Sequence, residues 1–448
     1  MVSLMLNIRA LHVSWGKMQG VFLHRRVFTQ MKKETVTTNQ ITEGVIWKQL
    51  LLFFFPIVLG TFFQQLYNTA DTIVVGRFVS KEALAAVGGS AAQIVGLIVG
   101  FFVGLASGAS VIISQFYGAK DRAQLNRALH TAYAFSIVGS IFITALGILT
   151  APWMLELMHT PQETMADALL YLRIYFAGII FVFIYNVGSS ILRAMGDSRR
   201  PLYYLIVCCI LNIVLDIVLV IVFHMGVAGV SIATIFSQGV SAVLVTRALM
   251  RSDDLYQLEF RKIRFHKSAL ISLIWVGCPT GIQSILYSVT NMLIQTFLNN
   301  LGTDTVAAWS AFGKIDSLYW MVNNAFGIAV TTFVGQNFGA GKYDRMKKSV
   351  RIGLCMGLCT ALALTLIFYN FGTPLFRLFT SDENVVSIGM QMLHHVAPAY
   401  CLFVFIELLS GALRGTGDVV IPMLITCFGV CLLRIAWLFF IVPLAPGL

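Results

Sequence analysis

The 448-residue sequence has little charge. Only 11% of its residues are charged, whereas 58% are hydrophobic. A soluble globular protein carries about 25% charged residues, so this chain could not cover a water-facing surface with polar groups. Its composition therefore excludes an ordinary soluble fold and makes lipid the expected solvent for most of the chain.

Long polar stretches are also scarce. The apolar segments between the polar breaks are close in length to the roughly 20 residues that a bilayer-spanning helix needs. Many of these segments contain Gly or Pro, which membrane helices tolerate. We predict an all-α polytopic membrane protein with eleven spans, at 46–70, 84–113, 128–150, 169–192, 202–223, 227–249, 269–298, 305–334, 350–372, 385–413 and 419–442.

The motifs of membrane-embedded enzymes are missing. The apolar segments contain no HExxH motif, Ser–His pair or metal-ligand cluster, which argues against hydrolytic or metal chemistry. All eight cysteines lie in apolar segments, and Cys355 and Cys359 share a helix face with no His or acid beside them. A zinc site would need such ligands. We therefore expect neither an enzyme nor a cofactor.

Acidic partners for the basic residues are few, and the net charge is +11. If the N-terminus is inside, most of the 31 Lys and Arg residues fall in the inner loops and tail, and only Arg77, Lys81 and Arg377 fall in outer loops. This is the positive-inside pattern. We predict a monomer in the inner (plasma) membrane with a cytoplasmic N-terminus and a basic cytoplasmic linker, residues 251–267. The lipid bilayer is its expected partner, and nucleic acid is not.

The chain contains an internal repeat with an offset of 221 residues. "SQFYGAKDRAQLNRA" at 114–128 matches "GQNFGAGKYDRMKKS" at 335–349, and "ILRAMGDSRRP" at 191–201 matches "ALRGTGDVVIP" at 412–422. Six spans in the first copy make the repeat parallel, with a pseudo-two-fold axis normal to the membrane. We therefore predict a first lobe of six helices, residues 46–250, and a second lobe, residues 268–448.

The repeat makes the two ends of the sequence look unusual. The second lobe shows only five spans, so we predict that a twelfth helix is missing and that the chain is truncated. Residues 1–45 are expected to form a cytoplasmic tail. Within this tail, residues 1–30 have no signal-peptide pattern, and Met31 opens a polar, basic lead into the first span. We predict that Met31 is the natural start and that residues 1–30 are not native; the alternative is that residues 1–30 are a genuine part of the cytoplasmic tail.

These motifs resemble those of the multidrug and toxic compound extrusion (MATE) transporters, in particular the prokaryotic DinF-like branch. The resemblance rests on "YNTADTIVVGR" at 67–77, the paired "SQ/GQ…GA" loops, the paired "LR-x-x-GD" turns and "LNIVLD" at 211–216. It implies two six-helix lobes around a central cleft that opens to either side in turn. It also implies an antiporter that exports organic cations or amphipathic drugs in exchange for H⁺ or Na⁺.

Two carboxylates stand out in the apolar part of the first lobe. At a rise of 1.5 Å per residue, Asp71, Asp216 and Thr234 each lie about 10 Å below the outer surface, and Asn212 is one turn from Asp216. Charges at such depth are costly and usually functional. Oxygen ligands suit a hard cation, and two close carboxylates suit a proton carrier. We predict a cation or proton site here, with Na⁺ as the only metal considered; a purely structural polar cluster is the alternative.

The second lobe lacks these acids, since the repeat places Trp437 opposite Asp216. The family resemblance agrees in ascribing the cation site to the first lobe, and it adds Tyr171 and Asn186 to the polar network. Glu407 falls opposite Asn186 in the repeat, which predicts a cleft-lining pair; the alternative is a buried, protonated Glu407. Pro56 permits a bend in the first span, and the resemblance links such a bend to protonation.

Two other functions are compatible with this sequence. A flippase for a lipid-linked precursor would share the duplicated fold, but it should carry several basic residues in its cleft. Deep inside the apolar segments only Arg173, Lys314 and Arg434 are basic, since Lys48, Arg247 and Arg351 lie within three residues of a segment end. An inactive truncated fragment is the other alternative. The sequence distinguishes neither H⁺ from Na⁺ nor one drug from another.

Overall fold

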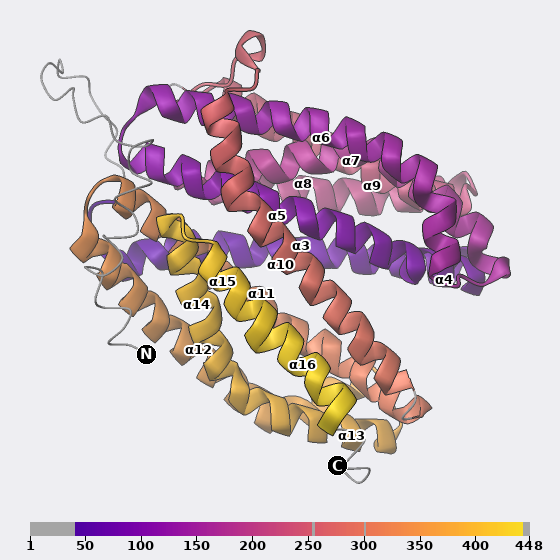
Figure 1. The fold of residues 1–448 in the computed structure, drawn as a ribbon. Helices are drawn as coiled ribbons and strands as arrows, with labels where there is room; N and C mark the ends of the chain where they lie inside the picture. The colour runs from indigo at the N-terminus through magenta and orange to yellow at the C-terminus, as the bar shows by residue number, and fades with distance from the viewer. Residues whose placement is uncertain (1–40, 253–255, 300–301, 442–448) are drawn as a thin grey trace, which may run out of the picture. The chain divides into compact units, whose positions relative to one another are not determined.

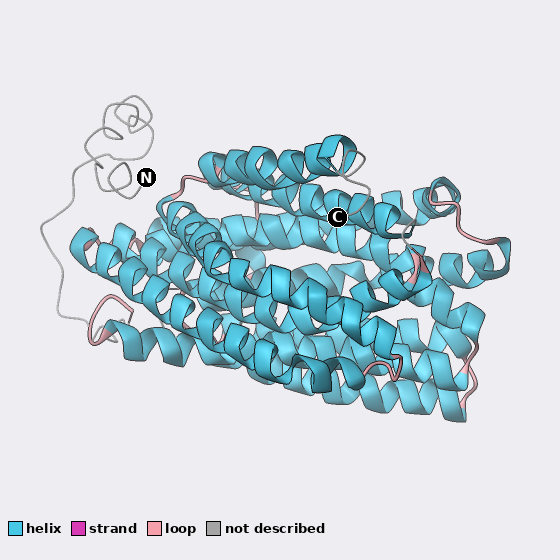
Figure 2. Cartoon of the chain, turned by 90° about the horizontal axis from the view of Figure 1, so that it is seen from below, coloured by secondary structure: helices cyan, strands magenta, loops and turns pink. Residues whose placement is uncertain are grey.

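The structure is a computed structural model that describes residues 41–252, 256–299 and 302–441. Over these residues the chain is helical apart from short turns and loops, and no strand occurs among them (Figure 2). The predicted non-native stretch, 1–30, and most of the predicted tail, 1–45, lie outside the described residues. The all-α prediction is confirmed.

The first lobe contains the six predicted spans. Their bounds are α3 (Ile46–Phe78), α4 (Lys81–Gly88) with α5 (Ser90–Gly118), α6 (Arg122–Leu157), α7 (Gln162–Ala194), α8 (Arg199–Asp216) with the π-helix η2 (Ile217–Val222), and α9 (Gly226–Met250). The predicted span 84–113 is thus two helices, and the first predicted span continues past residue 70 to Phe78.

The second lobe follows the same plan. Its elements are α10 (Lys267–Asn299), α11 (Thr303–Gly339), α12 (Tyr343–Arg377), α13 (Glu383–Val396), the 3₁₀ turn η4 (Ala397–Ala399), α14 (Tyr400–Thr416), α15 (Val420–Thr426), the π-helix η5 (Cys427–Leu432), α16 (Leu433–Ala436) and the π-helix η6 (Trp437–Ile441). The tenth predicted span is therefore α13 to α14, and the eleventh is α15 to η6.

The lengths and compositions of the helices agree with a multi-pass membrane protein. Ten helical stretches among the described residues are long and apolar enough to cross a membrane. The remaining predicted span, 305–334, lies in α11, a helix of 37 residues. Lys314 and Asp316 interrupt the apolar sequence of this helix.

The repeated turns have the same structure in both lobes. Gly196 and Gly417 each adopt a φ of 95°, the left-handed conformation that glycine adopts without steric cost at helix ends. The following Asp197 accepts backbone hydrogen bonds from Arg199 and Arg200, both at 3.1 Å, and Asp418 accepts one from Ile421 at 3.3 Å. The repeated "LR-x-x-GD" sequence therefore forms a similar turn after α7 and after α14.

Each lobe packs its first helix against the other lobe. Leu50, Phe53 and Phe54 of α3 belong to the hydrophobic core that α11, α12 and α14 build. Leu273 and Val276 of α10 belong to the core of α5, α6, α7 and α9, and Figure 1 shows α10 crossing the first-lobe helices. The lobes are thus joined through two equivalent helices, α3 and α10.

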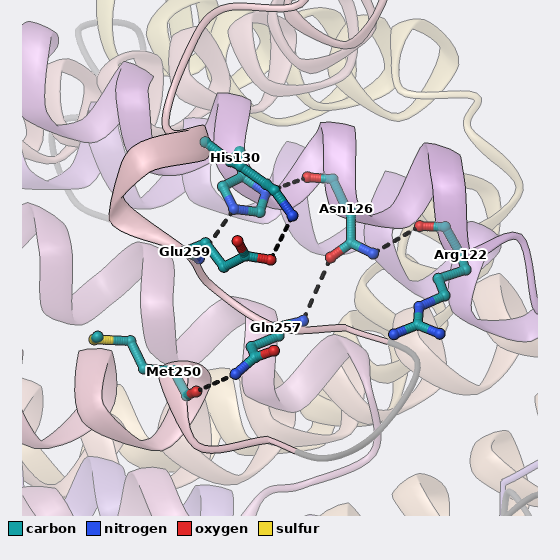
Figure 3. Close-up of polar contacts among 7 residues, drawn as sticks. Arg122, Asn126, His130, Met250, Gln257 and Glu259 are labelled. Carbon is teal, nitrogen blue, oxygen red and sulfur yellow. Dashed lines mark hydrogen bonds and ion pairs between the residues drawn. The ribbon is translucent and has the colours of Figure 1, made fainter.

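The linker between the lobes docks on the start of α6 (Figure 3). Nδ1 of His130 lies 2.7 Å from the Asn126 carbonyl, which only accepts, so Nδ1 carries the proton. Nε2 then accepts the backbone N–H of Glu259 at 3.1 Å. Tyr256 and Leu258 are buried beside this contact. His130, only 3% exposed, therefore fixes the linker as a neutral imidazole.

We expect that His130→Phe loosens the linker. The change removes the acceptor for Glu259, and each lost hydrogen bond shifts a local opening equilibrium by about 2- to 12-fold. Trypsin cleavage after Arg261 and Arg264 should accelerate accordingly. His395 bonds to the carbonyl one turn before it, Gln391, in the same way at 2.7 Å but has no linker contact, so His395→Phe is the control. Equal cleavage rates in His130→Phe and the wild type would contradict this role.

Candidate cation site

Four polar residues predicted to lie at one depth are brought together by α3, α8 and α9. The Thr234 hydroxyl lies 3.1 Å from Oδ2 of Asp71 and donates to it. The Asn212 amide reaches the same hydroxyl at 3.5 Å, a long contact for a hydrogen bond. The carboxyl groups of Asp71 and Asp216 lie within direct interaction distance of each other. The structure therefore places all four side chains in one cluster.

This cluster is buried and short of hydrogen-bond donors. Asp216 is fully buried, and Asp71 is 8% exposed. Both oxygens of Asp216, Oδ1 of Asp71 and Oδ1 of Asn212 have no hydrogen-bond partner among the described residues. Ionised carboxylates are acceptors only, so two facing carboxylates repel each other and leave their lone pairs unsatisfied. A proton or a metal cation between them would remove both penalties.

The local helix geometry explains why these residues meet. Asp71 lies inside α3 because that helix continues to Phe78. Asp216 is the last residue of α8, directly before the π-helix η2. Asn212 lies one turn earlier on the same face. Single π-helical turns inside α-helices are frequent at functional sites, and η2 begins immediately after the buried Asp216.

Three further residues belong to this site although the sequence did not single them out. Gln238 donates to the Tyr67 hydroxyl at 3.1 Å, and Tyr67 lies near Asp71. Tyr175 stacks on Tyr171 with ring centroids 6.0 Å apart, and both rings are near Asp71. The spacing offered a signal, because Tyr67 precedes Asp71 by one turn and Gln238 follows Thr234 by one turn.

Asn186 and Glu407 lie elsewhere. The Asn186 amide donates to the Val182 carbonyl of its own helix at 2.8 Å. Its side chain lines a mostly apolar cavity among α5, α6, α7 and α10, with an empty volume of about 380 Å³ that includes open solvent. Glu407 is not isolated, because Arg414 forms an ion pair with it at 2.7 Å. The sequence did not predict that ion pair.

Pro56 lies within α3, which runs as one helix from Ile46 to Phe78. A proline has no N–H to donate to the carbonyl one turn earlier, so α3 lacks one backbone hydrogen bond at this point. The predicted weak point is therefore on the helix that carries Asp71.

The second lobe has a fixed cation near the equivalent level. Nη1 of Arg434 lies 3.5 Å from Oδ1 of Asn291, and these residues occupy the repeat positions next to those of Asn212 and Asp71. A guanidinium remains charged at all ordinary pH values. At this level the second lobe therefore does not reproduce the pair of acids that could bind and release a cation.

Asp316, an acid of α11 in the second lobe, has a partner for each carboxylate oxygen. It accepts a hydrogen bond from the Tyr400 hydroxyl at 2.7 Å and another from the Trp320 indole at 2.9 Å. Lys314, two residues earlier, is exposed, because residues two apart on a helix point to different faces. The unpartnered oxygens of Asp71 and Asp216 thus distinguish the first-lobe cluster.

Comparisons with known proteins agree with a duplicated membrane transporter. The MatE family profile matches residues 56–218 and 279–440, one block in each lobe, so the chain belongs to the MATE family. It is 31% identical over 394 residues to the probable multidrug resistance protein YpnP of Bacillus subtilis, covering 88% of each chain. It is 28% identical over 410 residues to the probable multidrug resistance protein YoeA of the same organism, covering 90% of this chain and 88% of that one.

Solved structures share the fold. A MOP superfamily transporter from Pyrococcus furiosus superimposes with a TM-score of 0.84 at 22% identity, over 91% of this chain and 92% of that one. An outward-facing multidrug resistance MATE family transporter gives a TM-score of 0.82 at 23% identity, over 88% of each chain. The predicted family and the predicted fold class of duplicated lobes are therefore confirmed.

We expect opposite effects on stability from two aspartate substitutions. Asp216→Asn removes a buried charge, so at alkaline pH without Na⁺ its Tm should exceed that of the wild type. Asp197→Ala removes a helix cap worth about 1 kcal/mol, so its Tm should fall by about 1 °C. Thermal unfolding in detergent measures both. A lower Tm for Asp216→Asn under these conditions would mean that the carboxyl group is a structural requirement.

Proposed function

We propose that this chain is a secondary active exporter that moves organic cations or amphipathic drugs in exchange for H⁺ or Na⁺. The observation that carries this proposal is the fully buried Asp216, with two unpartnered carboxylate oxygens beside Asp71. Such a site can bind a monovalent cation at the depth of the lipid core and release it when the lobes rearrange. This would couple cation movement to drug export, as an antiporter requires.

Either coupling ion fits the residues present. A single proton shared by Asp71 and Asp216 would turn one carboxyl group into a donor and leave one negative charge. Na⁺ would instead use the oxygens of the two acids, Asn212 and Thr234, because hard cations prefer oxygen ligands. In both cases the bound ion lowers the electrostatic cost of burying two acids, and its loss raises it.

Pro56 offers a route from this site to the other lobe. Before Pro56, α3 packs into the second-lobe core through Phe53 and Phe54. The ring centroids of Phe54 and Phe326 are 4.0 Å apart. After Pro56, the same helix carries Asp71. We propose that α3 bends at Pro56 when the charge of the site changes, which would alter the contact between the lobes.

The basic residues deep within the spans favour a drug exporter over a lipid-linked precursor flippase. Arg173 and Lys314 are exposed and lie on different helices, α7 and α11. Arg434 contacts Asn291. Recognition of a diphosphate would favour several cations at one place, and these three are not grouped in that way.

Asp216→Asn should abolish gradient-driven efflux. The substitution keeps the size of the side chain but removes the titratable group. Ethidium efflux per folded protein should be measured in vesicles under an imposed pH gradient and, separately, an imposed Na⁺ gradient. We expect a fall to background for the gradient that drives the wild type. Asp71→Asn should do the same, and the double variant should be little worse, because both residues serve one site.

Asp197→Asn is the control for this experiment, because Asp197 lies in a turn at the other end of the lobe. It should lower the yield more than the efflux per folded protein. Full gradient-driven efflux by the Asp216→Asn protein would contradict the coupling role.

The proposed direction of export requires the linker to face the cytoplasm. Arg264→Cys, placed in a variant whose native cysteines are replaced by alanine, should resist an impermeant thiol reagent added to intact cells. Labelling should occur in inverted vesicles, because Arg264 is exposed. Rapid labelling in intact cells would reverse the predicted topology.

A further inference from the structure

We propose that Gln115 and Gln336 are positioning residues that hold the two lobes together at the end predicted to be cytoplasmic. Nε2 of Gln115, in the first lobe, donates to the Gly415 carbonyl in the second lobe at 2.9 Å. Nε2 of Gln336, in the second lobe, donates to the Ala194 carbonyl in the first lobe at 2.7 Å. Each lobe therefore donates one hydrogen bond and accepts one.

These two bonds are copies of each other. Gln115 and Gln336 are separated by the repeat offset of 221 residues, as are Ala194 and Gly415. The bond from Gln115 therefore maps onto the bond from Gln336 by the internal symmetry of the chain. The two bonds match in donor, acceptor and helix position, so they belong to the duplicated architecture of the chain.

The acceptors are well suited to this role. Ala194 is the last residue of α7, and Gly415 lies in the last turn of α14. The last four carbonyls of a helix have no partner within that helix, so a side chain from the other lobe satisfies a group that would otherwise stay unpaired. Gln336 is fully buried, which keeps water from replacing its bond while the lobes are closed.

The backbones also meet at this point. A Cβ atom at Gly118, one turn after Gln115, would overlap the Gln336 carbonyl, and a Cβ atom at Gly339 would overlap the Gln115 carbonyl. The C-terminal turns of α5 and α11 therefore touch along their main chains, which only glycine permits. The two glutamines lie within one turn of this contact and fix its register.

The consequence for transport rests on the proposed function. If the cleft opens to either side in turn, the lobes must separate here once in every cycle. Both bonds join neutral groups, so neither depends on the charge state of the coupling site, and each is weak enough to break reversibly. We infer that Gln115 and Gln336 set the ratio between the state closed at this end and the state open at this end.

The test measures the separation of the lobes directly. Spin labels at Arg122→Cys in α6 and Asp344→Cys in α12, both exposed positions, report the distance across the closed end by pulsed electron paramagnetic resonance. The native cysteines are replaced by alanine. Gln115→Ala and Gln336→Ala should each raise the open-to-closed ratio about 2- to 12-fold, the range for one lost hydrogen bond. The double variant should raise it by the product of the two factors.

Gln283→Ala is the matched control. Gln283 is also a buried glutamine, but its bond, to Thr426 at 2.8 Å, lies within the second lobe. This variant should leave the distance distribution unchanged. An unchanged distribution in the Gln115→Ala/Gln336→Ala protein, or an equal widening in Gln283→Ala, would overturn the proposal.

A second pair of variants covers the case in which the alanine proteins do not fold. Gln115→Met and Gln336→Met keep the side-chain size, but a thioether cannot donate to a carbonyl, so they should widen the distance as well. The measurement needs no transport activity. Widening in a protein whose wild type shows no gradient-driven efflux would refute the proposed function and leave this inference standing.

Discussion

Two carboxyl groups buried beside each other constrain the rest of the first lobe. Ionised, Asp71 and Asp216 would repel each other with several oxygens unpaired, in surroundings where an unpaired charge is expensive. Three helices must nevertheless bring these groups together with Asn212 and Thr234. A cation that enters and leaves the site gives a reason for this arrangement, because its binding largely removes the electrostatic cost of holding the two carboxyl groups together.

Shared packing offers a path from this site to the second lobe. Each lobe contributes its first helix to the core of the other, α3 on one side and α10 on the other. The helix that carries Asp71 is therefore also the helix that packs on α11 through Phe54 and Phe326. The glutamine contacts at Ala194 and Gly415 close the same interface at the helix ends. One helix, α3, thus carries an acid of the site and also part of the packing between the lobes.

The sequence predicted the fold well because its signals are periodic and repeated. Apolar length defined the spans, and the 221-residue offset located equivalent turns, including the left-handed Gly196 and Gly417. The estimated depth in the membrane was enough to predict that Asp71, Asp216, Asn212 and Thr234 lie at one level. Their clustering could be anticipated, but their hydrogen bonds could not.

Other features were not predicted, either because the relevant pair was not compared or because the contact joins distant segments. The ion pair of Glu407 with Arg414 joins residues seven apart on one helix, and the sequence interpretation compared Glu407 only with its repeat partner. The break between α4 and α5 falls inside an apolar run. The bonds of Gln115 and Gln336 span 300 and 142 residues, so the shared motif showed the repetition of these glutamines but not their acceptors.

Counting the ions that a drug displaces tests the coupling role of Asp71 and Asp216 most directly. Ethidium is added to purified protein in weakly buffered, ²²Na⁺-equilibrated solution, and the H⁺ and ²²Na⁺ released are measured together. The wild type should release about one monovalent cation per bound drug, as reciprocal linkage between the two sites requires, and Asp216→Asn should release none while still binding ethidium. Equal release from both proteins would show that the exchanged cation is bound elsewhere.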